Sequence, residues 1–218
     1  MYQVKLSTTG KTYPVGKILC LGRNYLDHIR ELGNQVSERA VIFSKPASSL
    51  LADGGLVRIP DYSNDCQHEL ELALLIGRPG KNIPAAHALE HLAGYGVALD
   101  LTLRDLQTEL KNQGLPWDLA KGFDTSCPLS DFTPPDRVTD PNKLDLTLTV
   151  NGQVRQQGNT GQMMRPVEKI IAEISRYFRL ESGDIILTGT PSGVAGITSG
   201  DRLEGTIEQV GKLHVSVA

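Results

Sequence analysis

The chain has 218 residues and a formal net charge of -3, from 22 Lys and Arg against 25 Asp and Glu. This length suffices for a full hydrophobic core, and the near-balanced charge, without blocks of one sign, argues against disorder and against a nucleic-acid partner. The first residues lack the apolar core of a signal peptide, and no apolar run reaches the ~18 residues of a membrane span. We therefore expect a cytoplasmic protein without a membrane partner.

The expected strands are alternating or continuous apolar runs between Gly and Pro residues. They are 15–22, 40–44, 68–76, 94–101, 144–150 and 184–188, with two more near the C-terminus. Asn151-Gly152 predicts a two-residue hairpin turn. The Pro- and Asp-rich segment 131–141 predicts a connection rather than an interdomain linker, because apolar residues resume directly after it.

Three segments have the 3.6-residue periodicity of helices. They are 25–32, 103–113 and 166–178. The first has Asn24 as candidate N-cap and Gly33 as its stop, and the second should begin after Thr102 and end at Gly114. Because strands outnumber helices and do not alternate with them regularly, the sequence predicts an α+β fold with antiparallel or mixed sheets.

The cysteines Cys20, Cys66 and Cys127 are odd in number and widely spaced. This spacing predicts reduced, buried thiols rather than disulfides or a zinc site. A catalytic cysteine has no local support.

The stretch HELELALLIG, residues 68–77, places two acids at the start of an apolar run. On a strand, Glu69 and Glu71 point to one face. Asp100 lies in a second apolar run, GYGVALDL, which also predicts a buried strand. Buried carboxylates must be protonated, paired or bound to a cation, and a set of oxygens alone suits Mg²⁺, Mn²⁺ or Ca²⁺. The alternative is that these are ordinary acids on the solvent side of half-buried strands.

His28 and Glu31 lie three residues apart on the first helix, so their side chains can meet. Both fall away from the arc of Leu26, Ile29 and Leu32 that we expect to face the core. A carboxylate that orients an imidazole makes a general base able to take a proton from water. The alternative is an exposed pair that stabilises the helix by about 0.3 kcal/mol.

Other polar residues have weaker local signals. Arg104 and Gln107, one helical turn apart, would lie within reach of anything bound at Asp100, and Arg suits a fork-like grip on a carboxylate. Lys121 is a lone lysine near an aromatic residue, and most such lysines only solvate a surface. The turn TGTPSG, residues 188–193, offers N–H groups that could bind an anion, although a turn without a ligand is the commoner explanation.

Several segments, taken together, resemble the fumarylacetoacetate hydrolase (FAH) family over nearly the whole chain. They are GRNYLDHIREL, FSKP, HELELALLIG, GYGVALDLTLRDLQ, KNQGLPWDLAKGFD, VNGQVRQQGNT and GDIILTGTPSGV, in the family's order. The length is similar to that of the short, single-domain acylpyruvase and oxaloacetate-processing branch. The resemblance implies one FAH-type catalytic domain over 1–218, a β-rich roll of mixed sheets with peripheral helices, assembled as a homodimer.

The resemblance also implies roles for individual residues. Implied ligands of Mg²⁺ or Mn²⁺ are Glu69, Glu71 and Asp100. Implied catalytic residues are His28 and Glu31, on a short lid helix of about residues 23–33, and Lys121. Implied substrate contacts are Arg23, Lys45, Arg104, Gln107, Gly189 and Thr190.

The activity that the resemblance implies first is hydrolytic C–C cleavage of a 3-acylpyruvate, such as acetylpyruvate or fumarylpyruvate, to pyruvate and a carboxylate. The metal would stabilise the enolate, and His28 would activate a water. Alternatives are oxaloacetate decarboxylation or keto–enol tautomerisation, isomerisation or hydrolysis of 2-oxo acids from aromatic catabolism, and a non-catalytic metal- or 2-oxo-acid-binding protein. Ser44, Gln67 and Ala195 depart from the family's pattern and would affect substrate preference.

Overall fold

The computed structural model of the chain describes residues 2–218, and its centre is a seven-stranded mixed sheet. Its strands lie in the order β4 (Val41–Lys45), β3 (Ile18–Gly22), β14 (Ile185–Leu187), β8 (Leu70–Ile76), β9 (Leu92–Leu99), β11 (Cys127–Leu129) and β5 (Leu50–Ala52). The neighbours β3 and β14, and likewise β11 and β5, are parallel, whereas the other pairs are antiparallel. The strands expected at 15–22, 40–44, 68–76, 94–101 and 184–188 all belong to this sheet.

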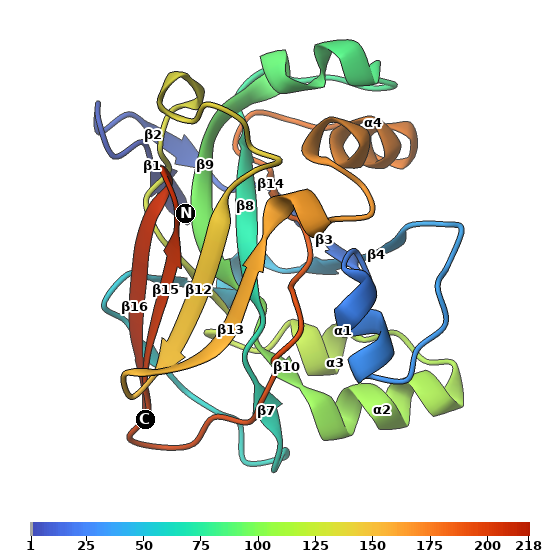
Figure 1. Cartoon of the computed structure of the whole chain (residues 1–218), viewed down its shortest axis with the longest axis vertical. Helices are drawn as coiled ribbons and strands as arrows, with labels where there is room; N and C mark the ends of the chain where they lie inside the picture. The colour runs from blue at the N-terminus through green and yellow to red at the C-terminus, as the bar shows by residue number, and fades with distance from the viewer. Residues whose placement is uncertain (1) are drawn as a thin grey trace.

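A second sheet has five strands and packs across one face of the first (Figure 1). Its strands lie in the order β13 (Gln153–Asn159), β12 (Asp145–Val150), β15 (Arg202–Ile207), β16 (Gly211–Val217) and β6 (Leu56–Val57). Asn151 and Gly152 join β12 to β13 with φ angles of 52° and 78°, which confirms the predicted two-residue turn. Two short antiparallel pairs complete the β structure: β1 (Gln3–Lys5) with β2 (Thr12–Pro14), and β7 (Cys66–Gln67) with β10 (Thr102–Leu103).

Strand β8 shows why the central sheet is buried on both faces. Every residue from Leu70 to Ile76 is buried, and alternate side chains enter different hydrophobic clusters. Leu72 and Leu74 face the second sheet and α4, while Ala73 and Leu75 pack with Phe132 on the other face. The strand therefore has an apolar core on each side, as its continuous apolar sequence predicts.

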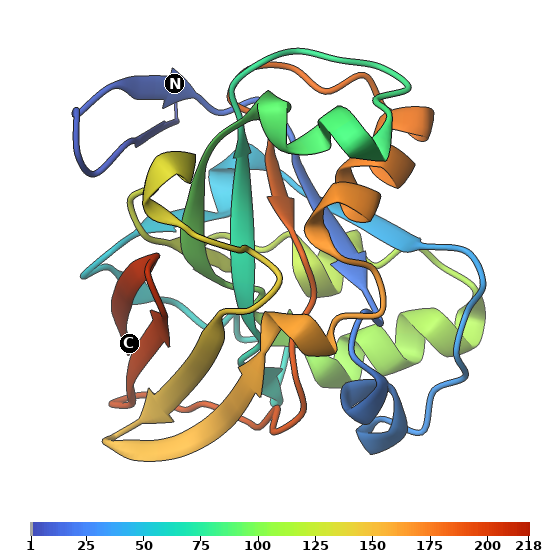
Figure 2. The same ribbon diagram turned by 45° about the horizontal axis from the view of Figure 1, so that its top comes forward.

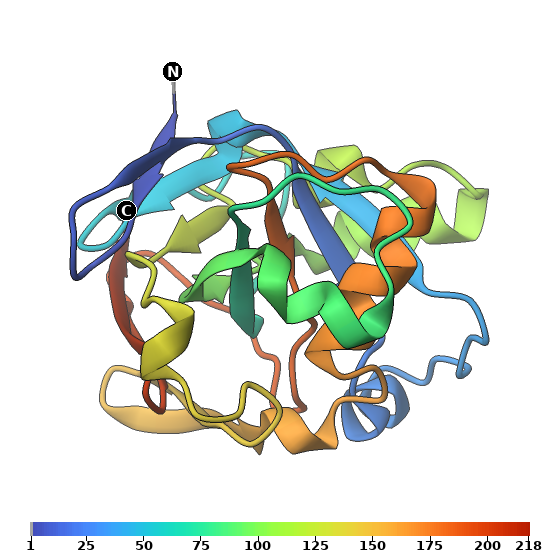
Figure 3. The same ribbon diagram turned by 90° about the horizontal axis from the view of Figure 1, so that it is seen from above.

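The helices lie around the sheets. They are α1 (Leu26–Glu31), α2 (Arg104–Gln113), α3 (Asp118–Lys121) and α4 (Val167–Tyr177), with short 3-10 helices at Ala47–Ser49, Ala85–His91, Pro135–Arg137 and Thr160–Gln162. Helix α4 runs beside the 3-10 helix Ala85–His91 (Figure 3), and Ser175 ties the two by accepting a hydrogen bond from the Ile83 N–H at 2.9 Å. Among residues 2–218, no helix has the length and apolar character that crossing a bilayer requires.

Helices α1, α2 and α3 gather on the side of the molecule away from β15 and β16 (Figures 1 and 2). Helix α2 ends at Gly114, whose φ of 67° gives the left-handed C-terminal geometry expected for this residue. Together with the mixed sheets, this arrangement confirms the predicted α+β fold, a β-rich roll with peripheral helices.

The predicted N-terminal ends of two helices are wrong. Helix α1 has Tyr25 at its N-cap, and Asn24 is instead fully buried, where its amide donates to Thr188 O at 2.9 Å. Thr102 lies in β10, and Leu103 takes the N-cap position of α2. The Asn24 amide is engaged by Thr188 O, while the Thr102 hydroxyl donates to Asp100 O at 3.0 Å and accepts from Lys121 Nζ, so neither side chain caps its helix.

The three cysteines are free and buried, as the sequence predicts. Burial, the largest cause, raises the pKa of the Cys66 and Cys127 thiols to about 12, and it raises the pKa of Cys20 well above its usual value. A buried thiol with a raised pKa is a poor nucleophile, which argues against a catalytic role for the three cysteines.

Helix α4 provides a test of the core. Ile171→Ala removes a fully buried side chain, so we expect the free energy of unfolding to fall by about 2–5 kcal/mol. Lys169→Ala, at an exposed position on the same helix, should change it by less than about 0.5 kcal/mol. Urea denaturation measures both, and equal effects would contradict the assigned packing of α4.

Candidate metal centre and active site

A cavity of about 110 Å³ opens between α1, α2, α3 and the ends of strands of the central sheet. Most of the residues predicted for the site line it: Arg23, His28, Glu69, Glu71, Asp100, Arg104, Gln107, Lys121, Gly189 and Thr190. Two others, Glu31 and Lys45, stand behind this wall. Segments distant in sequence therefore converge here.

Glu69, Glu71 and Asp100, which we call the acid cluster, lie where β8 begins and β9 ends. The pairing of Leu70 with Leu99 aligns these ends, and Asp100 N–H donates to Glu69 O at 2.8 Å. Each acid offers one oxygen within 4.8 Å of the others. Their exposed fractions are only 5%, 2% and 1%, which contradicts the alternative that they are ordinary solvated acids.

The acid cluster fits a hard divalent cation, because its donors are all carboxylate oxygens. Asp100 Oδ1 supports this fit. It is buried and lies 2.9 Å from Lys45 Nζ, yet it accepts no hydrogen bond among residues 2–218. Such an oxygen keeps a lone pair available, and a bound cation would satisfy it.

Basic side chains neutralise part of the acid cluster. Lys121 Nζ lies 2.9 Å from Glu69 Oε2 and 2.8 Å from Asp100 Oδ2, and it donates to Thr102 Oγ1 at 2.6 Å. The guanidinium of Arg104 forms an ion pair with the other oxygen of Glu69. These ion pairs therefore offset the free-energy cost of burying the ionised acids.

The three acids are not electrostatically equivalent. Burial, then the charges of Asp100 and Glu69, raises the pKa of Glu71 well above its usual value. Burial also acts to raise the pKa of Glu69, but Lys121 and Arg104 outweigh it and hold that pKa low. Burial acts to lower the pKa of Lys121, and the charges of Asp100 and Glu69 outweigh it, so the lysine stays an ammonium ion.

Lys45, which the resemblance implies to be a substrate contact, does not line the cavity. Its side chain is fully buried, and its ammonium donates to Leu101 O at 3.1 Å, to Ser126 O at 3.0 Å and to Lys121 O. It therefore faces Asp100 from behind the cavity wall and holds the segment that follows α3. These carbonyls satisfy an ammonium ion that solvent does not reach.

His28 and Glu31 form the predicted pair, with 3.2 Å between His28 Nδ1 and Glu31 Oε2. The exposed alternative is wrong, because His28 is 7% exposed and lines the cavity. The predicted apolar arc is also wrong in part: Leu26 is 43% exposed, and His28 turns inward beside Ile29. Glu31 Oε1 accepts the Gly193 N–H at 2.9 Å, which fixes the carboxylate that orients the imidazole.

The turn at 188–193 binds carboxylates of the protein itself. Gly189 N–H donates to Glu71 Oε2 at 2.6 Å, just as Gly193 N–H serves Glu31. Both glycines have positive φ, and a Cβ at Gly193 would lie 2.3 Å from Arg155 O. Thr190 is buried, and its hydroxyl donates to Leu70 O at 2.8 Å.

Arg104 is held in position by two amides. Its Nε donates to Gln67 Oε1 at 2.9 Å, and its Nη1 donates to Gln107 Oε1 at 2.6 Å. Gln67, one of the departures from the family's pattern, therefore helps to orient the guanidinium toward the acid cluster. The one-turn spacing of Arg104 and Gln107 on α2 explains the second contact.

Sequence reasoning missed several lining residues. They are Leu21, Gly22, Leu32, Asn34, Phe43, Thr108, Lys111 and Trp117. Helical spacing from Arg104 could have found Thr108 and Lys111 on α2. No local signal marks Asn34, which accepts a hydrogen bond from Lys111 Nζ at 2.6 Å and joins α2 to the segment after α1.

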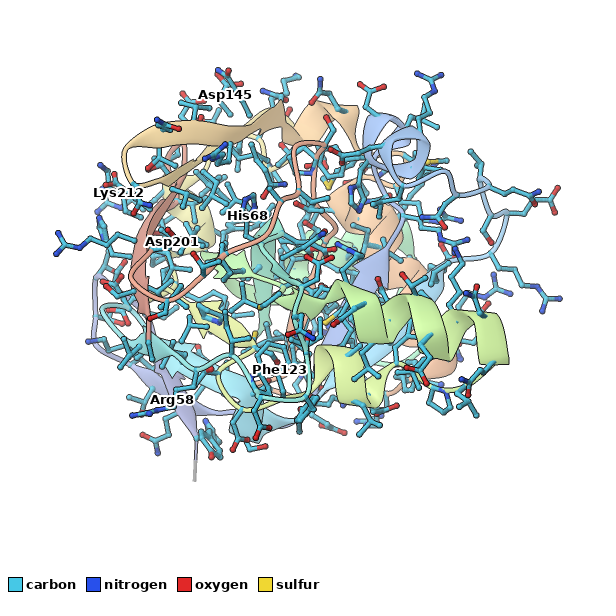
Figure 4. All side chains as sticks on the ribbon, turned by 90° about the horizontal axis from the view of Figure 1, so that it is seen from below. Arg58, His68, Phe123, Asp145, Asp201 and Lys212 are labelled. Carbon is cyan, nitrogen blue, oxygen red and sulfur yellow. The ribbon has the colours of Figure 1, made fainter. Side chains whose placement is uncertain are left out.

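A buried support beside the acid cluster was also missed. His68 lies inside the molecule (Figure 4), with Nδ1 3.0 Å from Gln156 Oε1. The same oxygen accepts the Leu70 N–H at 3.0 Å, and Gln156 Nε2 donates to Thr190 Oγ1 at 2.8 Å. The hairpin strand β13 thus braces β8 against the 188–193 turn through one amide.

The fold and the oxygen-rich centre define a family. Residues 17–218 match the family described as fumarylacetoacetate (FAA) hydrolase C-terminal, and the chain belongs to it. The chain is therefore an enzyme of the FAH family, and the non-catalytic alternative is set aside.

Among its relatives, oxaloacetate tautomerase YcgM of Escherichia coli (strain K12) is 47% identical over 197 residues, 90% of each chain. Oxaloacetate tautomerase FAHD1, mitochondrial, of Rattus norvegicus is 44% identical over 200 residues, 92% of this chain and 90% of that one. A solved structure, fumarylpyruvate hydrolase from Pseudomonas aeruginosa in complex with Mn²⁺ and pyruvate, superposes with a TM-score of 0.94 at 36% identity. That match covers 99% of this chain and 95% of the other.

Metal addition tests the acid cluster. Mg²⁺ or Mn²⁺ at a hundred times its dissociation constant should stabilise the metal-stripped protein by about 2.7 kcal/mol, because only the folded state holds the site. Glu71→Gln should abolish this stabilisation, whereas Glu208→Gln, at an exposed position, should retain it. Thermal melting measures the shift, and an equal shift in all three proteins would rule out the assigned ligands.

The raised pKa of Glu71 predicts a pH dependence of the metal-free protein. The folded state keeps this proton above the ordinary Glu pKa of about 4.3, where the unfolded chain has lost it. The stabilising contribution of Glu71 is therefore complete at low pH and is lost as pH rises through the folded pKa. Urea denaturation in chelator should show this decline in the wild type and a flatter profile in Glu71→Gln; parallel profiles would contradict it.

Proposed function

We propose that the chain catalyses the keto–enol tautomerisation of oxaloacetate, using Mg²⁺ or Mn²⁺ held by the acid cluster. The arrangement of His28 and Glu31 beside the acid cluster in one cavity carries this proposal, because it puts a general base next to the place where a cation would hold a 2-oxo acid. Two relatives named for oxaloacetate tautomerisation support oxaloacetate as the substrate.

A cation at the acid cluster would supply Lewis-acid stabilisation of the negative charge that develops when a 2-oxo acid enolises. Both Mg²⁺ and Mn²⁺ suit carboxylate oxygens, and the name of the solved relative includes Mn²⁺. The chain's own residues then have to bind the substrate and move the proton.

His28 is the group that moves the proton. Its Nδ1 faces Glu31, which favours the tautomer with the proton on Nδ1 and leaves Nε2 as the acceptor. In this proposal Nε2 removes a proton from C3 of oxaloacetate, and a proton returns to the C2 oxygen to give the enol. Glu31 stabilises the imidazolium that forms in between.

The substrate's carboxylates would be bound by the basic residues of the wall. Arg104 is held by Gln67 and Gln107 with its guanidinium edge at the acid cluster, and Arg23 lines the same cavity. We assign Lys121 to stabilising charge on the reacting oxygens, since it stays an ammonium ion in the buried site. Gly189 and Thr190 would shape the pocket beside Glu71.

Hydrolysis of 3-acylpyruvates, the activity that the sequence alone ranked first, is the second candidate. The close superposition on a fumarylpyruvate hydrolase favours it. The same dyad would activate a water against the acyl carbonyl, and the same enolate would leave. The two reactions share the acid cluster and differ in whether a carbon–carbon bond breaks.

A homodimer in the cytoplasm, one catalytic domain and a lid formed by residues 23–33 remain proposals that rest on the family resemblance. Light scattering would test the dimer.

The dyad is tested by His28→Ala. We expect the rate of oxaloacetate tautomerisation, followed by the ultraviolet absorbance of the enol, to fall by about 10²–10⁴-fold because the general base is lost. Binding of Mg²⁺ and oxalate should persist, since the acid cluster is intact. Arg30→Ala, at an exposed position on the same helix, should keep the full rate.

The same proteins should be assayed with acetylpyruvate. Faster turnover of acetylpyruvate than of oxaloacetate by the wild type would replace tautomerisation with hydrolysis as the main reaction. A His28→Ala variant as active as the wild type on both substrates would overturn the assigned base.

A further inference from the structure

The acid cluster is matched by an equal number of basic groups. We call Lys45, Lys121 and Arg104 the base cluster, since each lies within ion-pair distance of an acid-cluster oxygen. The two lysines are almost completely buried, and the side chain of Arg104 is 13% exposed. When all three acids are ionised, as they would be around a bound cation, the charges of the two clusters cancel and leave the charge of the cation itself unbalanced.

The base cluster contacts only two of the acids. Lys121 lies between Glu69 and Asp100, Lys45 stands behind Asp100, and Arg104 flanks Glu69. Glu71 has a backbone N–H as its partner. All four carboxylate oxygens of Glu69 and Asp100 therefore lie against a basic group, and a bound cation would share these oxygens with the base cluster.

A divalent cation alone would leave two positive charges uncompensated in a region that solvent hardly reaches. Such a charge is costly at low local dielectric. The surroundings do not remove it: Arg23 and Lys111 add positive charge to the cavity wall, and Glu31 is engaged by His28 and Gly193.

We propose that the base cluster makes cation binding depend on a dianionic co-ligand, so that the site takes up Mg²⁺ and a dianion together as a neutral pair. The substrate class that follows is dianionic 2-oxo acids, such as oxaloacetate, in preference to monoanionic ones such as pyruvate. This rests on the proposed function for the metal site and the 2-oxo acid class. By linkage, the cation must strengthen dianion binding by the same factor.

Calorimetric titration of metal-stripped protein with Mg²⁺ tests the coupling, using oxalate and oxamate as probes. Oxamate has nearly the shape of oxalate but carries one negative charge fewer. We expect saturating oxalate to tighten Mg²⁺ binding by about 10- to 100-fold and oxamate to have a much smaller effect. Equal effects of the two probes would overturn the proposal.

Variants of the base cluster separate charge balance from simple chelation. Lys45→Met removes a charge behind Asp100, out of contact with the cavity, so Mg²⁺ alone should bind about tenfold more tightly, and the oxalate factor should shrink accordingly. A purely structural role for Lys45 predicts the opposite, weaker Mg²⁺ binding. If Lys45→Met does not fold, Arg104→Gln decides the question by its binding of Mg²⁺ in the absence of oxalate, which should also be tighter. Arg30→Gln changes the net charge equally at an exposed position and should leave both quantities unchanged.

The outcomes also distinguish this inference from the proposed function. An unchanged oxalate factor in a folded base-cluster variant overturns the inference, even if the wild type tautomerises oxaloacetate. Coupled binding that the variants weaken, in a wild type without tautomerase activity, supports the inference and refutes the proposed function.

Discussion

The burial of the acid cluster is the constraint on which the rest of the site depends. The β8–β9 pairing brings Glu69, Glu71 and Asp100 together between two apolar clusters, where unpaired carboxylates would be costly. Compensation comes from the end of β4, the start of α2 and the end of α3, through Lys45, Arg104 and Lys121. The ion pairs with the acids therefore hold β4, α2 and α3 in position at the ends that carry these basic residues.

The 188–193 turn connects the two functional parts of the site. The Gly189 N–H donates to the carboxylate of Glu71, and the Gly193 N–H, four residues further on, donates to the carboxylate of Glu31. The left-handed φ angles of Gly189 and Gly193 make this geometry accessible, and side chains at these positions would clash with neighbouring atoms. The backbone of this turn thus holds the carboxylates of both Glu71 and Glu31, and the Glu31 side chain in turn orients the general base His28.

The central strands and the acid cluster could be predicted because their signals are local. The apolar run of β8 and the Asn151-Gly152 turn each determine structure within a few residues. The contacts that support the site could not be predicted, because they join residues that are far apart in the sequence. Lys121 and Glu69 are 52 residues apart, and His68 and Gln156 are 88 apart, so only the folded topology brings them together. Helix α1 has six residues, too few for periodicity to show which face is buried, and its inward-facing histidine was therefore assigned to the wrong side.

The cavity has two chemically different parts. Its floor is the buried array of acid and base clusters, where a change in one residue leaves another charge unpaired. Its rim is formed by residues such as Thr108 and Lys111, which are exposed on α2 and contribute little to the core. Substitutions at the rim therefore cost little folding stability, whereas substitutions in the floor leave a buried charge without its partner and cost more. The rim can thus change which molecules the cavity accepts while the groups of the floor stay in place.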